Sequence, residues 1–259
     1  MNRFPSIFVS HGSPAFILEK GPGYDFLAGF GKTLGRPRAV ICISAHWDTY
    51  RPAVSGAEHP ATIYDFYGFP RALYEIRYEP PGAPELAIEI AGALAAAGMS
   101  CDVDPQRGLD HGAWTPLVLM YPEADIPCLQ LSVSSPLGPD HHIALGRALA
   151  RFRDDGILIL GSGTATHNLR EFGLYPPDSP PPDYVADFAA WLEDRVQAGD
   201  LEAVAHFRRH GPAADRNHPS DEHFLPLVVA MAAGASPKGR TLHNSFSWGM
   251  MNLASFAFD

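Results

Sequence analysis

Cysteine is scarce in this sequence, with three residues among 259, and none of them forms a C-x-x-C pair. A dense disulfide framework and a cysteine-based zinc motif are therefore excluded. We interpret Cys42, Cys101 and Cys128 as buried core thiols without a function, in a protein of the reducing cytoplasm. The N-terminal segment MNRFPSIFVSHGSP has one arginine and only a short apolar stretch, so we expect neither a signal peptide nor a membrane span.

Basic residues are also few. The 19 Lys and Arg residues are outnumbered by 29 Asp and Glu residues, which gives a net charge of -10. Such a chain repels phosphate backbones and anionic lipid headgroups, so we expect a small-molecule partner and neither nucleic acid nor a membrane surface. With 46% hydrophobic and only 19% charged residues the chain is expected to fold, and residues 1–259 are expected to form one domain.

The sequence does contain short apolar runs rich in branched residues, which predict buried strands at residues 6–9, 39–44, 128–133 and 157–160. Helical periodicity occurs at residues 85–97, 142–152 and 184–196. Strands that alternate with helices predict an α/β fold with a mostly parallel or mixed sheet covered on both faces. We expect antiparallel edge strands in the tail at residues 241–258, and surface loops in the proline-rich stretches at 79–84 and 175–183.

Four histidines occupy places where a binding site is expected in such a fold, because ligands of an open α/β sheet bind at the carboxyl ends of the strands. Three follow a predicted strand and the fourth opens an apolar helical segment; they are His11, His46, His167 and His223. Ser220 or Asp221 is a plausible N-cap of that helix. Gly161 and Gly163, ahead of the third histidine, would let the backbone approach a bound group closely.

Neutral imidazole nitrogens bind Fe(II), Zn(II) and related metals, so histidines that converge on one crevice would form a metal site. Strand-end histidines also serve as acid–base groups or caps, and the sequence has no H-E-x-x-H helix to favour a metal. A fifth histidine, His111, follows Asp110, which would either orient it or cap a helix and leave it exposed. The others are interpreted as mostly solvated, with the last unassigned: His59, His141, His142, His206, His210, His218 and His243.

Six short motifs occur in order along nearly the whole chain. They are SHGSP at residues 10–14, SAHW at 44–47, YDFYGFP at 64–70, LDHGAW at 109–114, THNLR at 166–170 and EHFLP at 222–226. In order and spacing these motifs resemble the 4,5-DOPA extradiol dioxygenase-like family of class III ring-cleaving dioxygenases, which is related to the catalytic subunit of protocatechuate 4,5-dioxygenase. The resemblance implies a three-layer α/β/α sandwich and the insertion of O2 into a catechol-type substrate.

The resemblance also implies one metal ion at the strand ends, bound by His11, His46 and His223. His167 is then either a further ligand or the base that takes a proton from the substrate, and His111 is an acid or base beside the site. Two alternatives remain open. One is a zinc-dependent hydrolase that uses the same histidines, and the other is a metal-binding protein of this fold without turnover.

The ligand set leaves the identity of the metal open. Better-known dioxygenases of this class hold Fe(II) with two histidines and one carboxylate, whereas here His223 stands where the carboxylate is expected and Glu222 is its neighbour. We expect Fe(II) for activity and Zn(II) as the alternative bound metal, because all-histidine sites hold zinc well. The aromatic loop at residues 64–70 either walls the pocket or packs as a turn, and we interpret three nearby arginines as solvated or structural: Arg71, Arg77 and Arg170.

Overall fold

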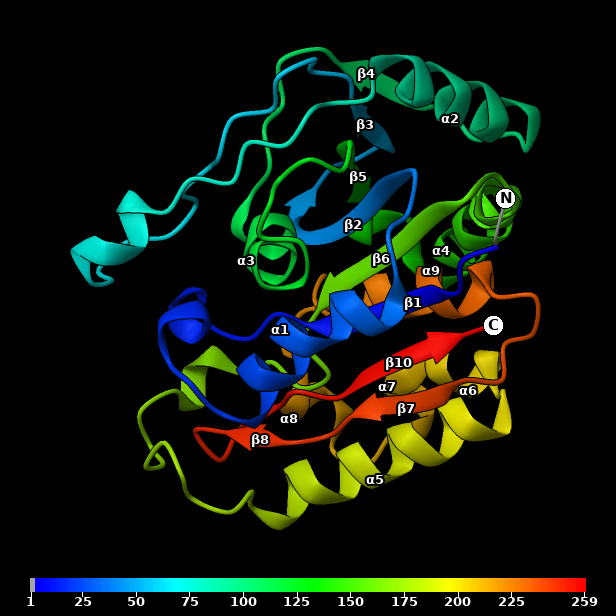
Figure 1. The fold of residues 1–259 in the computed structure, drawn as a ribbon. Coiled ribbons are helices and arrows are strands. Elements are labelled where there is room, and N and C mark those ends of the chain that lie inside the picture. Colours follow the sequence, from blue (N-terminus) through cyan, green and yellow to red (C-terminus); the bar gives the residue numbers. More distant parts are fainter. Residues whose placement is uncertain (1–2) are drawn as a thin grey trace.

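The computed structural model describes residues 3–259 and is built around one eight-stranded mixed sheet (Figure 1). Its strands are β1 (Ser6–Ser10), β2 (Ala39–Asp48), β3 (Ala53–Ser55), β4 (Asp102–Asp104), β5 (Cys128–Val133), β6 (Ile157–Gly163), β7 (Arg240–His243) and β10 (Ser255–Phe258), in the spatial order β4-β3-β5-β2-β6-β1-β10-β7. The central strands β5, β2, β6 and β1 are parallel, whereas β10 is antiparallel to β1 and β7, and β3 to β5. Two short strands, β8 (Phe246–Ser247) and β9 (Met251–Asn252), pair separately.

Helices cover both faces of this sheet. Figure 1 shows α1 (Pro22–Leu34) and α3 (His111–Met120) on the face opposite to α4 (Gly138–Leu149) and α9 (Leu225–Ala233). The remaining helices are α2 (Pro84–Ala96), α5 (Asp183–Ala198), α6 (Leu201–Ala205), α7 (Phe207–His210) and α8 (Ala214–Asn217), with short 3-10 helices at Pro14–Leu18, Arg71–Glu75, Ser135–Leu137, Ala150–Asp155 and Leu169–Glu171. The three-layer α/β/α sandwich expected from the sequence is confirmed. Within residues 3–259, no helix combines the length and apolarity that crossing a bilayer requires.

Side chains alternate along the central strands, because successive residues of a strand point to opposite faces. In β2, Val40 and Cys42 pack into the core cluster that contains Leu117 of α3. Ile41 and Ile43 pack into the opposite cluster, together with residues of α2 and α4. Since both faces are covered, most positions on either face are apolar, which is why the sequence shows nearly continuous apolar runs and not an alternating pattern.

The predicted elements are found, with shifted ends. The predicted strand at residues 128–133 matches β5, and the other three predicted strands extend further toward their carboxyl ends. The three predicted helices lie within four residues of the bounds of α2, α4 and α5. In the tail, β7 is an antiparallel edge strand as expected, but β10 lies inside the sheet between β1 and β7, so the edge prediction is wrong for β10. Helix α1 and the short strands β3 and β4 were not predicted.

The extension of β2 contains an irregularity that matters for the site. Ser44 pairs with Ser132, but the next pair joins Asp48 to Val133, so the residues between Ser44 and Asp48 bulge out of the ladder. His46 therefore lies on a bulge inside the strand and not after its end. Bulges re-aim side chains and are common next to active sites.

The predicted side-chain cap of the helix after His223 is wrong. Helix α9 has Phe224 as its N-cap and no side-chain cap. Asp221 contributes its backbone carbonyl, which accepts from the N–H groups of Phe224 and Leu225 (2.8 and 3.1 Å), while its carboxylate accepts from Arg208. The backbone of this tight turn thus satisfies helix donors that a side chain was expected to satisfy.

Burial corrects several predictions for thiols and imidazoles. Cys42 and Cys128 are buried as expected, whereas Cys101 is partly exposed. Among the histidines interpreted as solvated, His59 and His210 are exposed, but two are fully buried in the core: His142 and His218. His141 and His206 are half-buried, and so is His243, which was left unassigned.

The two buried core histidines should make the fold sensitive to mild acid. Burial lowers the pKa of His218 to about 3 and that of His142 to about 4. Because an unfolded histidine takes up its proton near pH ~6.5, the unfolded state binds more protons between about pH 6.5 and about pH 4. We therefore expect the free energy of unfolding to fall as the pH drops through this window, by up to ~1.4 kcal/mol per pH unit for each histidine.

Urea unfolding at about pH 7.5, 6 and 5 measures this loss. In the matched variant His218→Phe, the new ring would join the surrounding cluster of Phe188, Phe207 and Phe224. The pH dependence of this variant should be shallower than that of the unmodified protein, and equal slopes would contradict the prediction.

Candidate functional site

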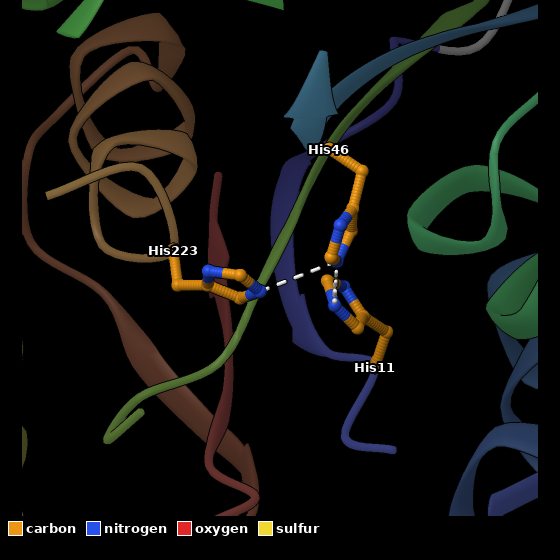
Figure 2. Close-up of side chains that lie close together, drawn as sticks. All are labelled: His11, His46 and His223. Carbon is orange, nitrogen blue, oxygen red and sulfur yellow. Dashed lines mark hydrogen bonds between the residues drawn. The ribbon is translucent and has the colours of Figure 1, made fainter. Parts of the chain in front are cut away.

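Three of the four histidines singled out in the sequence meet at one point: His11, His46 and His223. Nε2 of His46 lies 3.1 Å from Nε2 of His11 and 3.2 Å from Nε2 of His223. Figure 2 shows the three side chains pointing toward one another from separate segments of the chain. One ring nitrogen from each residue lies within 4.8 Å of the other two. Such an arrangement can supply three ligands to one metal ion.

The ends of the central strands place these rings. His11 directly follows β1, and its backbone N–H donates to the carbonyl of Gly163 in β6 (2.9 Å). His223 precedes α9, and its segment packs so closely on β6 that a Cβ at Gly163 would lie 2.0 Å from the His223 carbonyl oxygen. A Cβ at Gly161 would lie 2.3 Å from the carbonyl oxygen of Pro226, in the first turn of α9. The two glycines thus allow the close approach of the His223 segment, whereas the sequence suggested the approach of a bound group.

In His11 and His223, hydrogen bonds at Nδ1, the ring nitrogen that does not face His46, determine where the imidazole proton lies. The Ser162 hydroxyl donates to a backbone carbonyl, so its oxygen accepts from Nδ1–H of His11 (2.9 Å). Oε1 of Glu222 accepts from Nδ1–H of His223 (3.2 Å). Nε2 of both rings then carries a lone pair that faces His46. A neutral His46 has at most one proton on Nε2 and can donate it to only one of these two lone pairs. At least one lone pair therefore has no proton to accept, so this donor set fits a bound metal ion.

The protonation of the three rings agrees with that fit. Burial and nearby histidines lower the pKa of His46 to about 3 against the opposing effect of Asp65. Burial and the neighbouring histidines also hold the pKa values of His11 and His223 well below the ordinary value. All three are therefore neutral near pH ~7, and neutral imidazole is the form that binds a metal.

His167, the fourth strand-end histidine, lies beside this cluster. Its ring stacks on that of His223, with centroids 3.5 Å apart and an interplanar angle of 10°. An ion in the plane of one ring lies outside the plane of a parallel ring, so the two imidazoles are not arranged to share one ion. Glu222 lies on the Nδ1 side of His223. Its carboxylate and one ring nitrogen each of His167 and His223 lie within 4.8 Å of one another, so these three have the spacing of a second metal group, although the stacked rings do not point at one ion. Burial lowers the pKa of His167 to about 4, partly offset by the charge of Glu222.

His111 is the first residue of α3, and Asp110 is the N-cap of that helix, accepting from the N–H of Ala113 (3.3 Å). The capping role of Asp110 is confirmed, but the exposed His111 that this alternative implied is wrong. The His111 side chain is buried, with its ring centroid 3.8 Å from that of His46. Its acidic partner is Asp65, whose Oδ2 accepts from Nδ1–H of His111 (2.9 Å) and whose Oδ1 accepts from the backbone N–H (2.9 Å).

A cavity of about 490 Å³ opens at these histidines. Four of them line it, namely His46, His111, His167 and His223. Much of the remaining wall is aromatic or apolar and includes Phe66, Tyr67, Phe69, Leu169, Phe172 and Met251. The loop at residues 64–70 thus walls the pocket with three of its aromatic rings, while Tyr64 packs against Trp114. Three arginines are exposed and do not line the cavity: Arg71, Arg77 and Arg170.

Sequence reasoning did not assign a role to two residues that support this site. Ser162 holds His11 and comes from β6, where it pairs with Val9 of β1. Asp65 holds His111 from 46 positions away in the chain. The YDFYGFP motif contained the only signal for Asp65, an acid among aromatic residues.

Comparisons with known proteins agree with this geometry. The sequence model of the family described as the catalytic LigB subunit of aromatic ring-opening dioxygenase matches residues 7–258. The 4,5-DOPA dioxygenase extradiol of Beta vulgaris is 45% identical over 98% of this chain and 96% of its own length, and that of Escherichia coli strain K12 is 38% identical over 89% and 85%. The crystal structure of an uncharacterized protein from Escherichia coli K12 has a TM-score of 0.83 at 30% identity and covers 99% of this chain and 100% of the other. The resemblance seen in the six motifs is confirmed, and the chain belongs to the LigB family of aromatic ring-opening dioxygenases.

Proposed function

We propose that this protein is an extradiol dioxygenase that opens the ring of a catechol-type substrate with O2 at a single metal ion. The observation that carries the proposal is the convergence of three Nε2 atoms beside a cavity, in a member of a ring-opening family. The names of the relatives make DOPA the first substrate to test. A zinc-dependent hydrolase and a binding protein without turnover would use the same histidines, but the family does not favour either.

We further propose that residues 1–259 act as one catalytic domain. Strands from the two ends of the chain support this, because β1 and β10 are neighbours in the same sheet. We keep the reducing cytoplasm as the proposed compartment, supported by three free thiols.

We assign His11, His46 and His223 as the metal ligands, with Fe(II) for activity and Zn(II) as the alternative occupant. When bound, iron would supply chelation of both catechol oxygens and electron exchange with O2. Three protein ligands leave positions open for both reactants, and the stacked position of His167 keeps its ring from occupying one of them.

Two histidines outside the ligand set would handle protons. His167 would take the proton of a catechol hydroxyl, because its lowered pKa keeps it neutral near pH ~7 and it lines the cavity. His111, which lies against His46, would hydrogen-bond or protonate the second reacting oxygen. Phe66, Tyr67 and Phe172 would pack on the aromatic ring of the substrate and exclude water from it.

Oxygen uptake tests the function. Protein reconstituted anaerobically with Fe(II) should consume O2 and form a yellow ring-opened product when a panel of catechols, DOPA included, is added in air. Resorcinols, whose hydroxyls are not adjacent, and zinc-loaded protein should give neither signal. An iron-loaded protein that consumes no O2 with any catechol would overturn the proposal, and turnover by the zinc form without O2 would favour the hydrolase.

A further inference from the structure

A carboxylate of the aromatic loop contacts two histidines of the cavity at once. Both oxygens of Asp65 accept from His111, one from its ring and one from its backbone, at 2.9 Å each. Oδ2 also lies 3.6 Å from Nδ1 of His46. The side chain of His111 is 6% exposed and that of Asp65 is 23% exposed, so the pair is shielded from bulk water but open to the cavity that both line.

The loop that carries Asp65 is held by hydrogen bonds at the two residues that directly precede it. Nε1–H of Trp114 in α3 donates to the carbonyl of Ile63 (3.0 Å). The Tyr64 hydroxyl donates to the carbonyl of Ile76 (2.8 Å). Figure 1 shows that the chain between β3 and α2 reaches far away from the sheet. The bond from Trp114 docks this part of it on α3, and the bond from Tyr64 joins its two arms. A carboxylate held in this way can fix the orientation of its partner.

The contacts of Asp65 decide the state of the His111 ring. A carboxylate only accepts hydrogen bonds, so Nδ1 of His111 has to carry a proton. The other ring nitrogen, Nε2, is then the one left to exchange a proton with a reactant. The second oxygen satisfies an N–H at the start of α3, where helix donors lack partners and a negative charge is favourable.

We propose that Asp65 is a positioning residue that holds His111 as the Nδ1–H tautomer, so that Nε2 serves as the acid–base group of the cavity. This inference rests on the proposed dioxygenase reaction. The same oxygen faces Nδ1 of His46 at 3.6 Å, and the His46 and His111 rings are in contact, so the carboxylate lies beside both rings. Asp65 thus acts on the reaction through His111 and not by touching the substrate.

A double-mutant cycle measures whether Asp65 acts through His111. In the iron-loaded protein, Asp65→Asn should lower kcat about 10²- to 10⁴-fold, the range of a misplaced acid–base group, with KM and metal content changed less than about twofold. In the His111→Ala background the same substitution should lower kcat less than about twofold, because the group that it positions is gone. Equal losses in both backgrounds, or loss of metal from Asp65→Asn, would overturn the proposal in favour of a structural or ligand role.

The tautomer itself provides a readout that needs no turnover. Nitrogen-15 NMR of zinc-loaded protein should show the His111 proton on Nδ1, and Asp65→Asn should shift it wholly or partly to Nε2. The control Glu75→Gln removes a carboxylate from an exposed ion pair with Arg71 on the same segment and should leave tautomer and kcat unchanged. An unchanged tautomer in Asp65→Asn would refute the inference. Absence of turnover in the unmodified iron protein would count against the function alone, since the NMR result stands apart from it.

Discussion

Replacing His46 with Ala should abolish metal binding and, with it, turnover. Its Nε2 lies between those of His11 and His223, at 3.1 and 3.2 Å, so it is the nitrogen that joins the cluster. Changes in groups that only support a ligand typically cost about 10- to 100-fold in metal affinity, so loss of the ligand itself should cost more than about 100-fold. Turnover should fall below detection, because the reaction has no other site for its two reactants.

His167→Ala should give a different result from His46→Ala. Comparing the metal content of the two variants shows whether His167 is a metal ligand or a base. The His167 ring stacks on His223 and is not arranged to share an ion with it. Metal content should therefore be retained, while kcat falls about 10²- to 10⁴-fold through loss of the base. Loss of metal from this variant would make His167 a ligand and fill a position that the substrate needs.

Metal analysis and zinc titration calorimetry on the purified variants, followed by oxygen uptake with Fe(II), distinguish these outcomes. His210→Ala is the matched control, because this histidine is exposed on α7 and does not line the cavity. It should bind metal and turn over like the unmodified protein. Full metal occupancy in His46→Ala would disprove the assignment of the cluster.

The elements of the fold that could be predicted from the sequence are those whose structure depends on the local periodicity of apolar residues. The central parallel strands could be predicted because both of their faces are covered by helices. Neighbouring residues such as Val40 and Ile41 point to opposite faces and are both apolar, which gives a continuous apolar run in the sequence. The position of β10 inside the sheet could not be predicted from local patterns, because β10 pairs with β1, which lies at the other end of the chain. Helix α1 carries Gly29 and Gly31, which weaken the helical signal, and the second of these is required because a Cβ there would lie 2.0 Å from the Met120 carbonyl oxygen.

The site was predictable in its residue types and not in its orientations. Placement at strand ends pointed to His11 and His46, but the bulge that aims His46 depends on how β2 pairs with β5. Likewise, Asp110 precedes His111 in the sequence, yet the ring bonds to Asp65, because Asp110 turns to cap α3. A residue next to His111 in the sequence and a residue next to it in space can both serve as its hydrogen-bond acceptor, and the tertiary packing determines which of them does.

Gly112→Ala should damage the metal cluster without altering any of its ligands. A Cβ at this position would lie 2.4 Å from Oγ of Ser44, 2.9 Å from Cδ2 of His46 and 3.3 Å from Cε1 of His11. Ser44 cannot readily yield, because its hydroxyl donates to a carboxylate oxygen of Asp110 (2.6 Å) and accepts from the backbone N–H of His46 (3.2 Å). The added methyl group must therefore displace His46 or the start of α3. We expect a loss of about 1–3 kcal/mol in the free energy of unfolding and a clear loss of zinc affinity.

The matched control is Gly92→Ala in α2, where nothing lies within 4 Å of the added Cβ. In an open helical position Ala is favoured over Gly by about 0.5–1 kcal/mol, so this variant should gain stability and bind zinc normally. Because the two substitutions are chemically identical and both lie in helices, the difference between them isolates the contact with the cluster. Urea unfolding of the metal-free proteins and zinc calorimetry measure the two effects separately. If Gly112→Ala gained stability as Gly92→Ala does and kept its zinc affinity, the tight packing of α3 against His11 and His46 would not be what holds these rings in place.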